Sequence, residues 1–236
     1  MAKDLRGKRI VVVAPHSDDG VLSLGAAIAS WARRGAHVDL LTVFALDPES
    51  EAPAGGWDAR AGFRTEGEAA IRRREEDAAA CAILGATAAW LPFGSVDYDR
   101  HGDEAAVRDA VSAAADGVDA LLLPGFPLSH PDHEWLGRAL VGSRMGCRQL
   151  GLYAEQPYAR RAKGEPRVPP WSAEALGALP VFHPVSAGAR DRLAKWRAIR
   201  AYRSQLPLLG IRRSLRRGPH SLLRRELVAW VDGPGV

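Results

Sequence analysis

Cysteine is scarce in this chain, and its scarcity excludes two kinds of architecture. Cys81 and Cys147 are the two cysteines among 236 residues, and no CxxC spacing occurs. A disulfide scaffold needs more cysteines than this, and a zinc–thiolate framework needs them closely spaced. We therefore expect neither, and we predict a protein of the reducing cytoplasm.

Long apolar runs and targeting signals are also missing. No apolar run approaches the roughly 20 residues needed to cross a bilayer, and the first nine residues lack a signal-peptide pattern. We therefore expect no membrane span. With 47% hydrophobic and 25% charged residues, the chain is predicted to form one domain over residues 1–236.

The net charge of +4 is unevenly distributed. Between Arg190 and Arg225 there are 12 Lys or Arg and one acidic residue, so this segment carries +11 and the remainder −7. The asymmetry indicates either an anionic partner or a solvated helix face that packs against the acidic remainder. We do not expect nucleic-acid binding, because the segment has no recognised motif and only two aromatic residues, Trp196 and Tyr202. The predicted partner is a small-molecule substrate.

Strand and helix patterns alternate along most of the chain. Apolar runs predict buried strands at residues 8–14, 38–44, 88–93, 119–123 and 150–155. Three- and four-residue spacing predicts helices at 19–35, 68–84, 103–115, 133–145 and 189–202. This alternation predicts a doubly wound, Rossmann-like α/β fold, whose mainly parallel sheet has the order 3-2-1-4-5 and carries helices on both faces. Residues 47–67 are predicted to be a loop and a candidate lid. Residues 156–236 are predicted to form an irregular segment, a basic helix and a tail that pack on the domain.

Two clusters of ionisable side chains follow strands 1 and 4 of this predicted sheet. His16, Asp18 and Asp19 come directly after the first strand, and His130 and His133 follow the fourth. Ligands of doubly wound sheets bind outside the carboxyl ends of the strands where the strand order reverses. The two clusters are therefore expected to meet there. A nucleotide- or sugar-binding module without catalysis is the weaker interpretation, because no GxGxxG follows strand 1 and the carboxylates would repel phosphate.

Imidazole and carboxylate side chains in this arrangement are typical of a catalytic metal site. Three protein ligands with an open position are the pattern of catalytic zinc, and Fe²⁺ or Co²⁺ are substitutes that such ligands also accept. His16, Asp19 and His133 are the predicted ligands, and Asp18 is left unligated as the predicted general base. The alternatives are that Asp18 or Asp19 is a helix N-cap and that the histidines are solvent-exposed loop residues.

Four motifs together resemble one enzyme family. These are PHSDD at 15–19, RRRE at 72–75 leading to Leu84-Gly85, HPDH at 130–133, and Lys195 with YRSQ at 202–205. They resemble the PIG-L/LmbE family of zinc-dependent N-deacetylases, over residues 9–205. Members of that family remove acyl groups from amino-sugar nitrogens, and some cleave other amides such as thiol conjugates.

The resemblance assigns roles to particular residues. It implies zinc on His16, Asp19 and His133, with Asp18 as the general base. It also implies that His130 lies near the developing oxyanion, with Asp132 acting from close by. Arg72 and Asp97 match positions that contact the sugar in some members. The predicted function is a zinc-dependent hydrolase that removes an acyl group, expected to be acetyl, from an amino sugar or a molecule containing one. The alternative is a metal-dependent amidase acting on a non-sugar amide.

The chain departs from the family pattern at three positions. Ser17 replaces a proline and Gly20 replaces a glutamate in the first motif, and Leu128 stands where some relatives have a tyrosine. We expect the missing carboxylate at Gly20 to change the surroundings of the metal. Without a tyrosine at 128, oxyanion stabilisation is expected to depend on the metal and His130.

Overall fold

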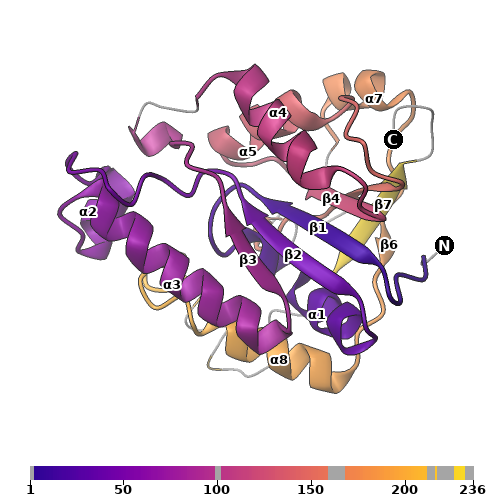
Figure 1. Ribbon diagram of the computed structural model, residues 1–236, viewed down its shortest axis with the longest axis horizontal. Helices are drawn as coiled ribbons and strands as arrows, with labels where there is room; N and C mark the ends of the chain where they lie inside the picture. Colours follow the sequence, from indigo (N-terminus) through magenta and orange to yellow (C-terminus); the bar gives the residue numbers. More distant parts are fainter. Residues whose placement is uncertain (1–2, 99–101, 159–167, 212–215, 217–225, 232–236) are drawn as a thin grey trace.

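A seven-stranded sheet forms the centre of the molecule, in the order β3-β2-β1-β4-β5-β7-β6 (Figure 1). The computed structural model describes residues 3–98, 102–158, 168–211, 216 and 226–231. The strands are β1 (Arg9–Ala14), β2 (His37–Thr42), β3 (Thr87–Trp90), β4 (Ala120–Pro124), β5 (Leu150–Tyr153), β6 (His183–Pro184) and β7 (Leu227–Val231). The first five strands are parallel, and their predicted order 3-2-1-4-5 is confirmed.

Helices cover both faces of the sheet, as predicted. The helices of the described residues are α1 (Asp19–Arg33), α2 (Gly56–Ala61), α3 (Glu66–Leu84), η1 (Val96–Tyr98), α4 (Glu104–Ala115), α5 (Pro131–Leu140), α7 (Pro170–Leu176) and α8 (Ala189–Ile199). Helices α1, α3 and α8 pack together on one face, and α4 and α5 lie on the other (Figure 1).

The two faces of β1 bury different side chains. Ile10 and Val12 belong to the apolar cluster under α1 and α8, whereas Val11 and Val13 belong to the cluster under α4 and α5. Successive side chains of a strand point to opposite faces, so a strand covered on both faces must be apolar throughout. This explains the continuous apolar run that marks β1 in the sequence.

The structure corrects three parts of the sequence prediction. The predicted loop at 47–67 contains α2, and Pro53 and Thr65 form a β-bridge across it. The predicted irregular segment at 156–185 contains α7 and β6, and helix α5 ends at Leu140 instead of residue 145. α2, α7 and β6 span seven residues or fewer, which is too short for hydrophobic periodicity to show them.

β7 is another element that the sequence prediction missed. It pairs antiparallel with β5 and with β6, so it covers an edge that β5 would otherwise expose. Most of the predicted basic tail, at 212–215 and 217–225, lies outside the described residues.

A buried ion pair joins helix α8 to the chain before β7, and its carboxylate also binds the backbone of helix α1. Lys195 Nζ lies 2.6 Å from Glu226 Oε1, and the Glu226 carboxylate accepts the backbone N–H groups of Ala26 and Ala27 at 2.9 and 2.6 Å. A Cβ at Gly25 would lie 2.8 Å from Lys195 Cγ, so the glycine leaves room for the lysine to cross α1. One cation of the basic segment therefore has a structural partner inside the protein.

Within the residues that the structure describes, no helix combines the length and apolarity that crossing a membrane requires.

Candidate active site

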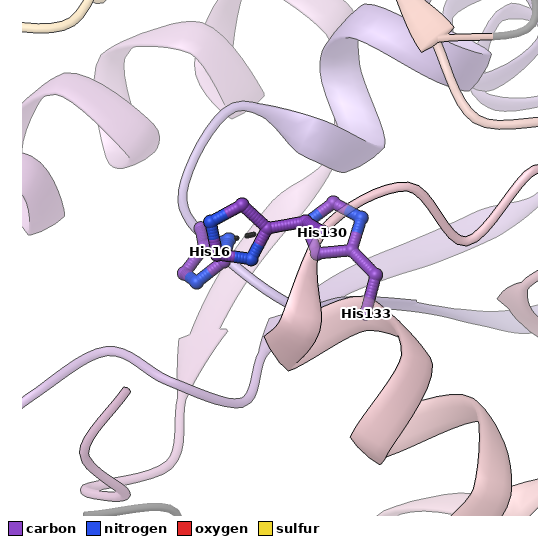
Figure 2. A group of neighbouring side chains, drawn as sticks. All are labelled: His16, His130 and His133. Atoms are coloured by element: carbon purple, nitrogen blue, oxygen red, sulfur yellow. Dashed lines mark hydrogen bonds between the residues drawn. The ribbon is translucent and has the colours of Figure 1, made fainter. Parts of the chain in front are cut away.

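The two polar clusters meet at the carboxyl ends of β1 and β4. These strands pair in parallel from Ile10 opposite Ala120 to Val12 opposite Leu122, so the turns that follow them lie side by side. Figure 2 shows the rings of His16, His130 and His133 gathered between the turn before α1 and the first turn of α5. The meeting expected from the predicted topology is present in the structure.

Three donor atoms form a small triangle. His16 Nδ1 lies 3.2 Å from Asp19 Oδ2 and 3.3 Å from His133 Nε2, and His133 Nε2 lies 3.1 Å from Asp19 Oδ2. Ligands held tetrahedrally at about 2.0–2.1 Å from an ion are separated by about 3.4 Å. The triangle therefore has the size and the nitrogen–oxygen chemistry of a zinc site.

A second grouping, His16 with His130 and His133, also brings ring nitrogens within 4.8 Å of one another. This spacing is wider than the edge of a tetrahedral site, and His130 Nδ1 already accepts the backbone N–H of Asp132 at 3.2 Å. We therefore give more weight to the set that includes Asp19, and the ligand assignment stays a prediction.

Carboxylates orient both histidines of the triangle. His16 Nε2 lies 2.7 Å from Asp132 Oδ2, and His133 Nδ1 lies 2.7 Å from Glu155 Oε1. Such carboxylate–histidine pairs fix the tautomer and ring direction of metal ligands. Burial raises the pKa of Glu155 to about 7, and His133 opposes this shift.

Glu155 was missed as a site residue by sequence reasoning. It follows β5, the strand that pairs with β4, and the prediction placed it as the last residue of that strand. The available signal was a carboxylate at the same sheet end as the two clusters.

Asp18 occupies the N-cap position of α1 without acting as a cap. Its side chain makes no capping hydrogen bond, and its backbone has φ 112° and ψ −35°. Few residues other than glycine adopt positive φ, and such strain is concentrated at functional sites. Burial, together with the neighbouring Asp19 carboxylate, raises the pKa of Asp18 well above its usual range. The geometry therefore does not support the N-cap interpretation of Asp18.

His130 is a neutral imidazole in this environment. Burial and the neighbouring His16 and His133 lower the pKa of His130 to about 4. Its Nδ1 accepts the Asp132 N–H, so in the neutral ring the proton is on Nε2. His130 can therefore donate one hydrogen bond from Nε2.

A cavity of about 210 Å³ lies against the site, and His16, Asp18, Asp19, His130 and Asp132 are among the residues that line it. Its wall also includes Trp57, Arg60, Asp97 and Tyr158. Asp97, a predicted sugar contact, lies in this wall, where its carboxylate accepts the backbone N–H of Trp57 at 2.8 Å. A larger cavity of about 700 Å³, beside Trp230 of β7, is lined by none of the predicted site residues.

Arg72, the other predicted sugar contact, does not line the cavity of about 210 Å³. It pairs with Glu75 at 3.0 Å and with Glu76 at 3.2 Å. Its neighbour Arg73 lines the cavity instead and forms an ion pair with Asp58. Adjacent helix positions are about 100° apart around the axis, so a run of three arginines does not itself show which one faces the site.

Two departures from the family pattern receive a structural account. A Cβ at Gly20 would collide with Leu40 Cδ1 on β2, so position 20 faces the apolar core and not the donor triangle. The expected change in the surroundings of the metal is not supported. Leu128 packs beside Gly137 of α5, where a Cβ would lie 2.8 Å from Leu128 Cδ1.

With this geometry established, comparison with known proteins identifies the family. Residues 11–142, more than half of the chain, match the PIG-L family, described as GlcNAc-PI de-N-acetylase. The chain belongs to the PIG-L family. It is an N-deacetylase, as predicted, and its group of three histidines, His16, His130 and His133, fits the binding of a metal ion.

Two curated relatives are deacetylases from Streptomyces. The chain is 31% identical over 252 residues to a 2'-N-acetylparomamine deacetylase of Streptomyces fradiae, covering 97% of this chain and 83% of the relative. It is 28% identical over 179 residues to a 1D-myo-inositol 2-acetamido-2-deoxy-alpha-D-glucopyranoside deacetylase of Streptomyces griseus subsp. griseus, covering 68% of this chain and 54% of the relative.

Solved structures share the fold. A deacetylase triple mutant from the teicoplanin biosynthetic pathway superposes with a TM-score of 0.72 at 25% identity, covering 97% of this chain and all of that one. An N,N'-diacetylchitobiose deacetylase of Pyrococcus horikoshii gives a TM-score of 0.57 at 17% identity, covering 98% of this chain and 88% of that one. The second likeness shows the fold alone.

Proposed function

We propose that this enzyme is a zinc-dependent N-deacetylase that removes the acetyl group from an amino sugar or from a natural product containing one. The observation that carries the proposal is the triangle of donor atoms, with edges of 3.1 to 3.3 Å, two of whose residues, His16 and Asp19, line one cavity with Asp18. The printed names of the relatives support the substrate class, since they describe an acetylated paromamine and an acetamido sugar joined to inositol.

His16, Asp19 and His133 would hold the ion, with Asp132 and Glu155 orienting the two imidazoles. When bound, a zinc ion supplies Lewis acidity, which polarises an amide carbonyl and lowers the pKa of water. Two nitrogens and one oxygen suit Zn²⁺, and Fe²⁺ or Co²⁺ would fit the same donors.

Asp18 and His130 would carry the proton chemistry. Asp18 has no capping bond to occupy its carboxylate, so it is available to take a proton from the attacking water. His130 donates from Nε2 to the oxygen that becomes negative as the amide carbonyl is attacked. The proton held by Asp18 then passes to the departing nitrogen, which leaves as the free amine.

The test is metal analysis combined with a screen of N-acetylated amino sugars and their conjugates, detecting free amine or acetate. We expect one zinc per chain and acetate release in the wild type. His133→Ala should lose the metal, whereas Asp18→Ala should keep it and lose nearly all turnover. His37→Ala is the matched control, because His37 is exposed at the start of β2 and should change neither quantity.

Several results would contradict the proposal. Full activity in both His133→Ala and Asp18→Ala would refute the site assignment. If the enzyme cleaved the amide of a thiol conjugate and accepted no amino sugar, its substrate would be a non-sugar amide. Stoichiometric metal without any hydrolysis would indicate a binding module.

A further inference from the structure

We propose that Trp57 determines specificity for a sugar ring: its indole is the surface on which the ring stacks while the N-acetyl group reaches Asp18. The inference rests on the proposed function and concerns the same cavity. Trp57 lines that cavity, is half-buried, and belongs to none of the three apolar clusters of the described residues. A tryptophan outside the core but inside the catalytic cavity is available to a ligand.

The polar groups of Trp57 are already occupied within the protein. Its backbone N–H donates to Asp97 Oδ2 at 2.8 Å, and its indole N–H donates to Gln205 Oε1 at 2.8 Å. Indole has one donor and no acceptor. The side chain therefore offers a ligand its apolar ring and not a hydrogen bond.

The ring is also held in place before a ligand arrives. The Arg60 guanidinium carbon lies 5.0 Å from the ring centre. The next residue, Asp58, accepts a hydrogen bond of 2.6 Å from Tyr98 and pairs with Arg73 of α3. A prepositioned aromatic surface binds without a large ordering cost.

Gly55 allows this arrangement. A Cβ at Gly55 would lie 2.5 Å from Asp97 Oδ2, so a larger residue would push the Asp97 carboxylate away from the first turn of α2, whose backbone it binds at Trp57. Gly55 therefore allows an aromatic ring and a carboxylate to lie side by side in the cavity wall.

An aromatic ring beside a carboxylate matches the two surfaces of a pyranose. The C–H groups of a pyranose form an apolar face. Its hydroxyl groups form a polar rim and can donate hydrogen bonds to a carboxylate such as that of Asp97. The cavity volume of about 210 Å³ equals that of about seven water molecules. The ligand class is therefore one N-acetylated hexosamine ring inside the cavity, with any further ring outside it. An acyclic N-acetyl amine has the same amide but no face to stack.

The experiment compares two substrates across matched variants of the zinc-loaded enzyme. The substrates are the best N-acetyl amino sugar of the screen and acyclic N-acetylethanolamine. Trp57→Ala should raise KM for the sugar about tenfold, with kcat within about twofold, and should leave the acyclic amide unchanged. Trp57→Phe keeps an aromatic ring and should retain most of the sugar affinity.

Trp196→Ala is the matched control. Trp196 is also half-buried and stacked by an arginine, with Arg200 4.7 Å from its ring centre, but it packs on the cluster under α8 and not in the cavity. It should leave the ratio of kcat/KM for the two substrates unchanged. Thermal unfolding and zinc content are measured for every variant.

The outcomes separate the inference from the proposed function. Equal losses on both substrates, or no loss in Trp57→Ala, would refute the role of Trp57 while the wild type remained a deacetylase. A wild type that hydrolysed the acyclic amide as well as the sugar would also refute it. A wild type that hydrolysed no amino sugar would refute the proposed function, and this inference with it.

Discussion

Asp18 offers a test in which activity and stability are expected to diverge. Its φ of 112° and ψ of −35° lie in a region that glycine adopts freely and alanine does not. Asp18→Ala and Asp18→Gly both remove the buried carboxylate, so the loss of its charge cancels when the two variants are compared. The remaining difference between them is the backbone strain.

The size of this difference follows from two opposing terms. A non-glycine residue held at such torsion angles costs about 1–3 kcal/mol, and glycine loses about 0.5–1 kcal/mol more chain entropy than alanine on folding. With the middle of each range, Asp18→Gly should therefore unfold with a free energy about 1 kcal/mol higher than Asp18→Ala. For a chain of this length that corresponds to a Tm higher by about 2–4 °C.

The assay is thermal and denaturant unfolding of both variants at equal zinc occupancy, together with acetate release. Asp116 provides the control, because it follows helix α4 with an ordinary φ of −62°, and there the alanine variant should be at least as stable as the glycine variant. An Asp18→Ala protein as stable as Asp18→Gly would refute the strain argument. Substantial turnover in either one would refute the general-base role.

Three further predictions concern positions around the site and in the core. Glu155→Gln should weaken zinc affinity about 10- to 100-fold, because the carboxylate that orients His133 is lost; chelator competition measures this, and unchanged affinity would contradict it. Lys195→Met should cost about 3–5 kcal/mol by leaving the buried Glu226 charge unpaired, and adding Glu226→Gln should recover part of that loss in urea unfolding; a double variant less stable than the single one would contradict the argument. Gly20→Ala should cost about 1–3 kcal/mol by overpacking against β2, with the metal content of the folded enzyme retained; unchanged stability would show that the core can adjust.

Some segments could be predicted because their sequence pattern and their position in the fold require the same residue types. The strand at the start of the chain is apolar throughout because both of its faces are covered. Its neighbour in the sheet follows from the alternation of strands and helices. Once that pairing was predicted, His16 and His133 had to lie near each other, although 116 residues separate them.

Other features depend on contacts that leave no periodic trace. Whether Arg72 or Arg73 faces the cavity depends on the rotation of α3 about its own axis. Position 20 appeared to concern the metal, but its direction is determined by the packing of α1 on β2. Both are questions of which way a side chain points, and sequence spacing alone does not answer them.

The sequence by itself determined the order of the five parallel strands and the residue types that meet at their carboxyl ends. Both follow from hydrophobic period and from the topology rules of parallel sheets. Only the tertiary structure decided which atoms form the donor triangle, that Glu155 orients His133, and that Gln205 holds Trp57 in the cavity wall. These contacts join elements that are distant in the chain, and their distances are set by how helices and loops pack on the sheet.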